Sequence, residues 1–281
     1  MKIIRTVHEM QSEADTLRQA GKKIGLVPTM GYLHEGHLSL IRIAKARADV
    51  VVVSVFVNPT QFAPSEDLDK YPRDSERDER LAKKSGADII FYPSKKEMYP
   101  EHYLTYVNVE EITGILCGTS RPIHFRGVTT VCTKLFLAVK PHFAVFGQKD
   151  AQQAVIIRRM VKDLNFDMKI IVGPIIREKD GLAMSSRNAY LSPEERQDAL
   201  ALNESLKLAE DIIAKGEKRT KNIIQTMREH VNSKEHTLID YISIVHPETL
   251  SPLNKIEDRA LIALAVFVGK TRLIDNTKLE I

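Results

Sequence analysis

Apolar positions in the first part of the chain alternate between helical and strand spacing. Residues 6–20 carry apolar side chains three and four positions apart and begin with a capping box, Thr6 with Glu9, which predicts a helix. The short apolar run at residues 24–28 predicts a strand, and the nearly continuous β-branched run at 50–57 is typical of a strand covered on both faces of a parallel sheet. A helical pattern between these runs completes a strand–helix–strand unit.

The same alternation continues to about residue 172. Further helices are predicted at 74–84, at 128–138 and from Asp150 onward, and further strands at 88–92, 143–146 and 168–172. This order predicts an α/β fold with a Rossmann-type, doubly wound parallel sheet, in which ligands bind beyond the carboxyl ends of the strands.

The pattern changes after a loop at residues 179–192. Two long helices are predicted at 193–215 and 218–233, followed by strand-like runs at 238–245 and 261–268. We therefore expect two domains, residues 1–175 and a smaller α+β domain at 176–281, with the loop as a lid at their boundary.

Composition narrows the class of protein. The 281 residues are 43% hydrophobic and 28% charged, which is typical of a globular protein. The longest apolar runs are far shorter than the roughly 20 residues of a membrane span, and the amino terminus contains no secretory apolar region, so we expect a cytoplasmic protein. Cys117 and Cys132 have no CxxC partner, and neither a disulfide nor a zinc site is expected.

The charge pattern does not indicate nucleic acid as a partner. The formal net charge is +4, but Lys and Arg alternate with Asp and Glu along the predicted helices. A mild positive balance suits anionic small molecules equally well.

The first motif, PTMGYLHEGH at residues 28–37, lies between a predicted strand and a predicted helix. The amino terminus of a helix presents unpaired N–H groups and a positive dipole end, which favour phosphate binding. Gly31 and Gly36 allow the backbone to approach a nucleotide, while His34 and His37 lie on one side and can donate to phosphate oxygens. Zincin helices space their histidines four apart, so a metal site is disfavoured; plain capping and surface roles stay open.

Two further motifs follow predicted strands. Asn58 and Gln61 lie in VNPTQF and carry amides that suit a ligand with a carboxylate and hydroxyls, although an ordinary Asn-Pro turn is an alternative. In FGQKDAQQ, Lys149 offers a charge to phosphates and Asp150 an acceptor to a ribose hydroxyl. Gln153 lies one turn further on and could contact the same small ligand as Gln61, but a helix cap with solvated charges is equally compatible.

The loop at the expected domain boundary contains KDGLAMSSRN. Two hydroxyls followed by an Arg can surround a triphosphate, and a flexible linker is the alternative. Upstream, RPIHFRGV contains Arg121 and His124, for which a place in the site and a structural role are both open.

Four of these motifs, in this order, resemble the nucleotidyltransferase superfamily that includes the class I aminoacyl-tRNA synthetases. The segment from His34 to His37 resembles its HIGH-type signature, and the segment from Met184 to Arg187 resembles its KMSKS loop. Within that group, PTMGYLHEGHLSL, FVNPTQF, HFRGVTTV, FGQKDAQQ and KDGLAMSSRN are together similar to the motifs of the pantothenate synthetases, or pantoate–β-alanine ligases. The resemblance extends from about residue 23 to residue 192.

The resemblance implies a role for each matching position. The catalytic residues would be His34, Lys149 and His37, the last as proton donor; Gln61 and Gln153 would bind pantoate, and Gln61 would also touch β-alanine. The positions implied to bind ATP are Met30, Gly31, Tyr32, Leu33, His34, Glu35, Gly36, His37, Gly147, Gln148, Lys149, Asp150, Ile176, Met184, Ser185, Ser186 and Arg187.

The resemblance also implies the reaction. Pantoate, ATP and β-alanine would give pantothenate, AMP and pyrophosphate through a pantoyl adenylate, in a homodimer that uses Mg²⁺ with ATP; no metal-ligating residue is assigned from the sequence. Two alternatives remain: a nucleotidylyltransferase acting on a phosphorylated substrate, which would need more Arg and Lys in place of Gln61 and Gln153, and a non-catalytic nucleotide- or RNA-binding module. The latter is disfavoured because no concentrated basic face is evident.

Overall fold

The computed structural model describes residues 1–63, 68–69 and 71–280, and it divides into two compact units. The first comprises Met1–Gly147 and Ile156–Pro174, and the second Gln148–Val155 and Ile175–Ile281. The segment Gln148–Val155 thus belongs to the second unit, although it precedes the domain boundary expected at residues 175 and 176.

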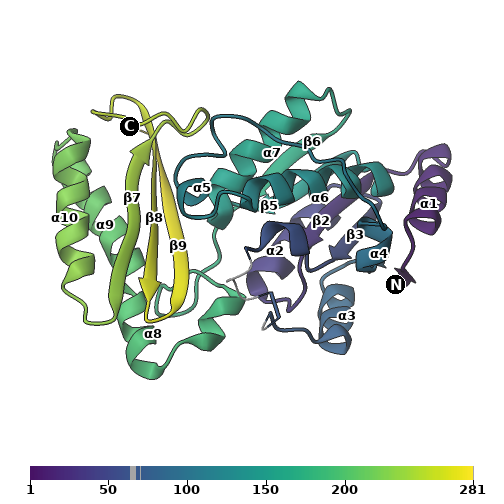
Figure 1. The fold of residues 1–281 in the computed structure, drawn as a ribbon, viewed down its shortest axis with the longest axis horizontal. Helices are drawn as coiled ribbons and strands as arrows, with labels where there is room; N and C mark the ends of the chain where they lie inside the picture. Colours follow the sequence, from purple (N-terminus) through teal and green to yellow (C-terminus); the bar gives the residue numbers. More distant parts are fainter. Residues whose placement is uncertain (64–67, 70, 281) are drawn as a thin grey trace. The chain divides into compact units, whose positions relative to one another are not determined.

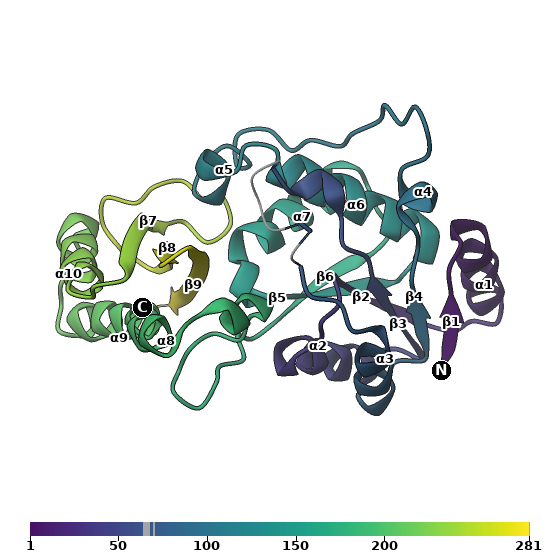
Figure 2. The ribbon, with the colours of Figure 1, turned by 60° about the horizontal axis from the view of Figure 1, so that its bottom comes forward.

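The first unit is built on one sheet of six parallel strands, in the order β1-β4-β3-β2-β5-β6 (Figures 1 and 2). The predicted doubly wound parallel sheet is confirmed. The strands are β1 (Lys2–Ile4), β2 (Ile24–Thr29), β3 (Val50–Val55), β4 (Ile89–Phe91), β5 (Phe143–Gly147) and β6 (Lys169–Gly173).

The strand order reverses between β2 and β5. From β2 the chain proceeds outward through β3 and β4, and then returns to place β5 and β6 on the other side of β2. The described ladder joins β2 to β5 through only two residue pairs, Gly25 with Phe143 and Leu26 with Ala144, whereas six pairs join β2 to β3. Because ligands of open α/β sheets bind at such a switch point, the carboxyl ends of β2 and β5 are where a site is expected.

Helices cover both faces of this sheet. One face packs on α1 (Val7–Gln19), α6 (His124–Val139) and the later residues of α7 (Ala151–Asp163), and the other on α2 (Glu35–Lys45) and α3 (Ser75–Lys84). Figure 2 shows α2 and α3 on the side opposite α6. Successive residues of β2 alternate between the two cores, Leu26 into the first and Val27 into the second, as expected for a strand buried on both faces. The short helices α4 (Lys95–Met98) and α5 (Cys117–Ser120) complete this unit.

The second unit is α+β. Its antiparallel sheet has the order β7-β8-β9, and helices pack against this sheet to form a separate core (Figure 1). The elements are α8 (Pro193–Ala199), α9 (Ala201–Ala214), α10 (Thr220–Asn232), β7 (Thr237–Val245), β8 (Arg259–Val268) and β9 (Thr271–Glu280).

Two features of this unit differ from the prediction. The single helix expected at 193–215 is wrong: α8 and α9 are separate, because the N–H of Leu200 bonds to the carbonyl of Gln197 and tightens the chain there without a Gly or Pro to mark the break. Strand β9 was not predicted, because the buried polar residues Asp275 and Asn276 interrupt its apolar pattern. No helix among the described residues is long and apolar enough to cross a membrane.

Candidate active site

The turn after β2 has an unusual backbone. Gly31 and Tyr32 both have positive φ angles, 84° and 51°. A Cβ at Gly31 would lie 2.9 Å from Val55 Cγ1 and 3.0 Å from an oxygen of Asp78, so glycine is favoured there by conformation and by space. The turn leads directly into α2, whose amino terminus was predicted to bind phosphate.

A buried carboxylate holds this turn. Asp78 on α3 is 2% exposed, and its two oxygens accept hydrogen bonds from the N–H groups of Tyr32 and Leu33, each at 2.7 Å. Burial raises the pKa of Asp78 above its ordinary value, and the two backbone hydrogen bonds act in the opposite direction. The sequence prediction missed Asp78 because it lies in a highly charged helix; the available signal is its position four residues before the buried Ala82.

The two histidines at the start of α2 lie side by side. Their ring centroids are 4.1 Å apart, and Nδ1 of His37 accepts the N–H of His34 at 3.4 Å. A neutral His37 with an accepting Nδ1 carries its hydrogen on Nε2. His37 can therefore offer an N–H donor from the first turn of the helix.

The amide of Gln61 is oriented by its neighbours. Gln61 ends the 3₁₀ helix η1 (Pro59–Gln61), and its Oε1 accepts from Nδ2 of Asn58 at 3.1 Å. Its Nε2 donates to Sδ of Met30 at 3.1 Å. The structure thus brings together two predicted site residues from separate motifs, with the NH₂ of Gln61 turned toward Met30 in the turn after β2.

Asn58 is itself fixed on both sides. This residue is 1% exposed; its Nδ2 also donates to the carbonyl of Gly127 at 3.0 Å, and its Oδ1 accepts from the hydroxyl of Tyr99 at 2.8 Å. Burial raises the pKa of Tyr99, so the phenol stays protonated and can donate. Because Asn58 accepts from Tyr99 with its Oδ1, its Nδ2 donates to Oε1 of Gln61. The other end of the Gln61 amide is therefore the NH₂ group, a donor.

Arg121 and His124 contact the backbone of the same segment. Nδ1 of His124 lies 3.0 Å from the carbonyl oxygen of Gln61, and a guanidinium nitrogen of Arg121 lies 3.4 Å from it. Gly127 lets α6 approach η1 closely, since a Cβ there would be 2.4 Å from the carbonyl oxygen of Thr60. Both side chains thus contact the backbone of a predicted site residue.

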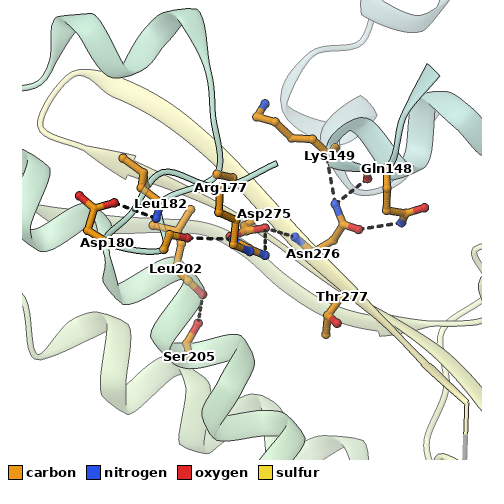
Figure 3. A network of polar contacts seen from close by, with 12 residues as sticks. Gln148, Lys149, Arg177, Asp180, Leu182, Leu202, Ser205, Asp275, Asn276 and Thr277 are labelled. Atoms are coloured by element: carbon orange, nitrogen blue, oxygen red, sulfur yellow. Dashed lines mark hydrogen bonds and ion pairs between the residues drawn. The ribbon is translucent and has the colours of Figure 1, made fainter. Parts of the chain in front are cut away.

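In the second unit, the turn after β5 is held from β9. This turn is the 3₁₀ helix η2 (Gln148–Asp150), and Nδ2 of Asn276 donates to the carbonyls of Gln148 and Lys149 at 3.0 and 2.9 Å. Figure 3 shows these contacts, with the Lys149 side chain pointing away from them. Gln153 lies in the first turn of α7 and is partly buried.

Two other predicted nucleotide contacts face each other across a tight hairpin. The N–H of Met184 donates to the carbonyl of Ile176 at 3.0 Å, and Arg177 pairs with Ala183. Beyond the hairpin, the hydroxyl of Ser185 accepts the N–H of Arg187 at 3.2 Å and caps η3 (Ser186–Tyr190). The loop expected to act as a lid therefore has defined local structure.

Comparison with known proteins shows which family the chain resembles. Residues 2–278 match the sequence model of the pantoate–β-alanine ligase family. A pantothenate synthetase of Acetivibrio thermocellus is 55% identical over 281 residues, the full length of both chains. One of Thermotoga petrophila is 57% identical over 99% of each chain.

Solved structures give the same result. The crystal structure of pantothenate synthetase from Thermus thermophilus has a TM-score of 0.93 and 43% identity over 99% of each chain. The pantoate–β-alanine ligase of Francisella tularensis, complexed with β-γ ATP and β-alanine, has a TM-score of 0.83 and 37% identity over 99% of this chain and 97% of that one. On the sequence match and the fold together, the chain belongs to the pantoate–β-alanine ligase family.

Proposed function

We propose that the enzyme condenses pantoate with β-alanine in two steps through a pantoyl adenylate, releasing pyrophosphate and then AMP. The observation that carries this proposal is the contact between Met30 in the turn after β2 and the amide of Gln61. An element suited to a nucleotide thus lies against a donor suited to a carboxylic acid. The β-γ ATP and β-alanine in the Francisella tularensis ligase support the same substrates.

In the first step, a carboxylate oxygen of pantoate attacks the α-phosphorus of ATP, and the bond from that phosphorus to pyrophosphate breaks. Gln61 donates to an oxygen of pantoate and holds it in line. The charge that develops on the phosphates is stabilised by the N–H groups at the start of α2, by His34, and by the Nε2 hydrogen of His37.

The remaining residues assigned to ATP divide by chemistry. Lys149 supplies a positive charge to the phosphates, and Asp150 accepts from a ribose hydroxyl. The guanidinium of Arg187 and the hydroxyls of Ser185 and Ser186 contact the triphosphate, and Gln153 binds pantoate with Gln61. The rest contribute backbone and apolar contacts: Gly31, Tyr32, Leu33, Glu35, Gly36, Gly147, Gln148, Ile176 and Met184.

In the second step, the neutral amine of β-alanine attacks the acyl carbon of the adenylate. A carbon–nitrogen bond forms, the bond from the acyl carbon to the AMP oxygen breaks, and the amine loses a proton. Gln61 contacts β-alanine in this step. No covalent intermediate with the enzyme is required.

Mg²⁺ is proposed to arrive with ATP. Mg²⁺ that accompanies ATP is generally bound by phosphate oxygens with one or two protein ligands at most. Bound there, Mg²⁺ would neutralise phosphate charge. The family resemblance also supports a homodimer and a cytoplasmic location, and sedimentation of the purified enzyme tests the dimer.

Exchange of labelled pyrophosphate into ATP tests the two-step scheme. We expect exchange to require pantoate and to proceed without β-alanine, because adenylation needs only the carboxylate and the α-phosphorus. Exchange that appears only after addition of β-alanine would contradict the scheme. Pyrophosphate release that depends on a phosphorylated substrate would indicate a nucleotidylyltransferase instead, and no release with any substrate would indicate a binding module.

A further inference from the structure

Asn276 lies where polar contacts of the second unit converge (Figure 3). It is 3% exposed on β9, and its Nδ2 donates to the carbonyls of Gln148 and Lys149. Its Oδ1 accepts from Nε2 of Gln148 at 2.8 Å. Both carbonyls can only accept hydrogen bonds, so the side chain at this position must donate, as the NH₂ of Asn276 does; a carboxylate of the same shape would face two carbonyl oxygens.

An ion pair adjoins Asn276. Asp275 is 2% exposed and forms a two-pronged pair with Arg177, with distances of 2.6 and 3.0 Å. An oxygen of Asp275 also accepts the N–H of Asn276 at 2.8 Å, and Arg177 donates to the carbonyl of Gly181 at 3.1 Å. The same pair therefore fastens both β9 and the hairpin that joins Ile176 to Met184.

We propose that Asn276 is a positioning residue that fixes the backbone of the Gln148–Lys149 turn and so aims the Lys149 ammonium at the phosphates of ATP. The Arg177–Asp275 pair holds Asn276 in register with the hairpin that carries Met184. This proposal rests on the role proposed above for Lys149. Asn276 acts through the turn and does not itself touch the substrate.

The chain offers a matched set of variants. Asn276→Asp keeps the shape and removes the NH₂, Asn276→Ala removes the whole amide, and Thr277→Val serves as the control. Thr277 is the next residue of β9, and its hydroxyl donates to Glu210 at 2.7 Å, away from the turn. The control thus loses a side-chain hydrogen bond of the same strand without changing a contact to Gln148 or Lys149.

The measurement is pantoate-dependent pyrophosphate exchange, with kcat and the KM values for ATP and pantoate, beside the melting temperature of each variant. A misplacement of about 1 Å can slow a reaction by on the order of 10²-fold, so we expect Asn276→Asp to lose roughly 10- to 100-fold in kcat. The KM for pantoate should stay within about twofold, because Gln61 and Gln153 are unchanged. Thr277→Val should exchange at the wild-type rate even where its melting temperature falls.

A double variant separates positioning from general loss of structure. If Asn276 acts through Lys149, Asn276→Asp should slow exchange no further in a Lys149→Ala background. Full losses in both backgrounds would overturn the proposal, as would a wild-type rate in Asn276→Asp. If Asn276→Asp does not fold, Asn276→Ala gives the same comparison. A wild-type enzyme without pantoate-dependent exchange would instead overturn the proposed function.

Discussion

The turns that follow β2 and β5 are each held by one buried polar side chain from a distant segment, and the two side chains have opposite chemistry. Asp78 accepts from two backbone N–H groups of the first turn, 46 and 45 residues before it. Asn276 donates to two carbonyls of the second turn, 128 and 127 residues before it. Buried backbone groups need partners, so the groups that a turn leaves unpaired determine which side chain can hold it.

Asp78 and Asn276, the side chains that hold the two turns, also differ in charge. Asp78 is a carboxylate whose burial raises its pKa, and its partners are neutral N–H groups. Asn276 is neutral, and the charge of the neighbouring Asp275 is balanced by Arg177. The first turn should therefore respond to removal of a negative charge, and the second to exchange of an amide for a carboxylate.

The largest effect is expected at the tip of the second turn. Lys149→Ala should lower the rate of adenylation by on the order of 10²- to 10³-fold, because a positive charge at the phosphates matters most as charge redistributes. The KM for pantoate should change little. Single-turnover adenylation measures this, with the exposed Lys215→Ala as control. A rate within a few-fold of wild type would remove Lys149 from the mechanism.

The next largest effect is expected from a change at Asp78, which holds the first turn. Asp78→Asn replaces one accepting oxygen by an NH₂ that faces a backbone N–H, and a lost hydrogen bond to a charged group costs about 1.5–3 kcal/mol. We expect a lower free energy of unfolding in urea and slower pyrophosphate exchange. Glu76→Gln, an exposed change on the same helix, should leave both unchanged. An active and stable Asp78→Asn enzyme would show that the turn keeps its shape without the carboxylate.

The helices and strands could largely be predicted, because their patterns depend on residues close together in the sequence. The helix start at Thr6, whose side chain accepts the N–H of Glu9, and the strand β3, whose Val52 and Val53 enter opposite cores, are examples. The side chains that hold the two turns could not be predicted, since Asp78 lies among other charges of α3 and Asn276 lies on an unpredicted strand. Their importance depends on contacts between distant segments, which local spacing does not reveal.

The candidate site, too, depends on contacts between distant segments that could not be predicted from the sequence. Sequence motifs and resemblance identified Gln61 and Met30 separately, and only the structure shows that their side chains are in contact. The orientation of the Gln61 amide depends on Tyr99, 38 residues further along the chain, through Asn58. No local pattern around Tyr99 indicates that role.

A smaller effect should distinguish the acid-binding residues from both turns. Each of Gln61 and Gln153 is proposed to bind pantoate, and an unpaired buried polar group costs about 1–3 kcal/mol, which corresponds to roughly 5- to 150-fold in affinity. Alanine at either position should raise the pantoate requirement by that factor while ATP binding alone stays near wild type. Gln61→Ala should also weaken the β-alanine step.

Isothermal titration with ATP and with pantoate separately decides between these roles. Loss of pantoate binding alone supports direct contact with the acid. Equal losses for both ligands would mean that the two glutamines maintain the fold or the nucleotide site.

The smallest effect is expected at the opposite, amino-terminal ends of β2 and β5, where His142 holds the backbone without facing either turn. Its Nδ1 accepts the N–H of Ile24 at 2.9 Å, and burial, aided by the nearby charge of Arg18, lowers the pKa of His142 below its ordinary value of 6.5. As the pH falls, His142 therefore takes up a proton in the unfolded chain before it does so in the folded one. The stability that comes from this difference in pKa is complete above pH 6.5 and is lost as the pH falls from there through the lower pKa of the folded state. His142→Asn can still accept from Ile24 without titrating, so the melting temperature of wild type should fall more steeply than that of the variant between about pH 7 and pH 5. Pyrophosphate exchange at neutral pH should be the same in both proteins. Parallel melting curves across this range would show that His142 does not couple protonation to folding.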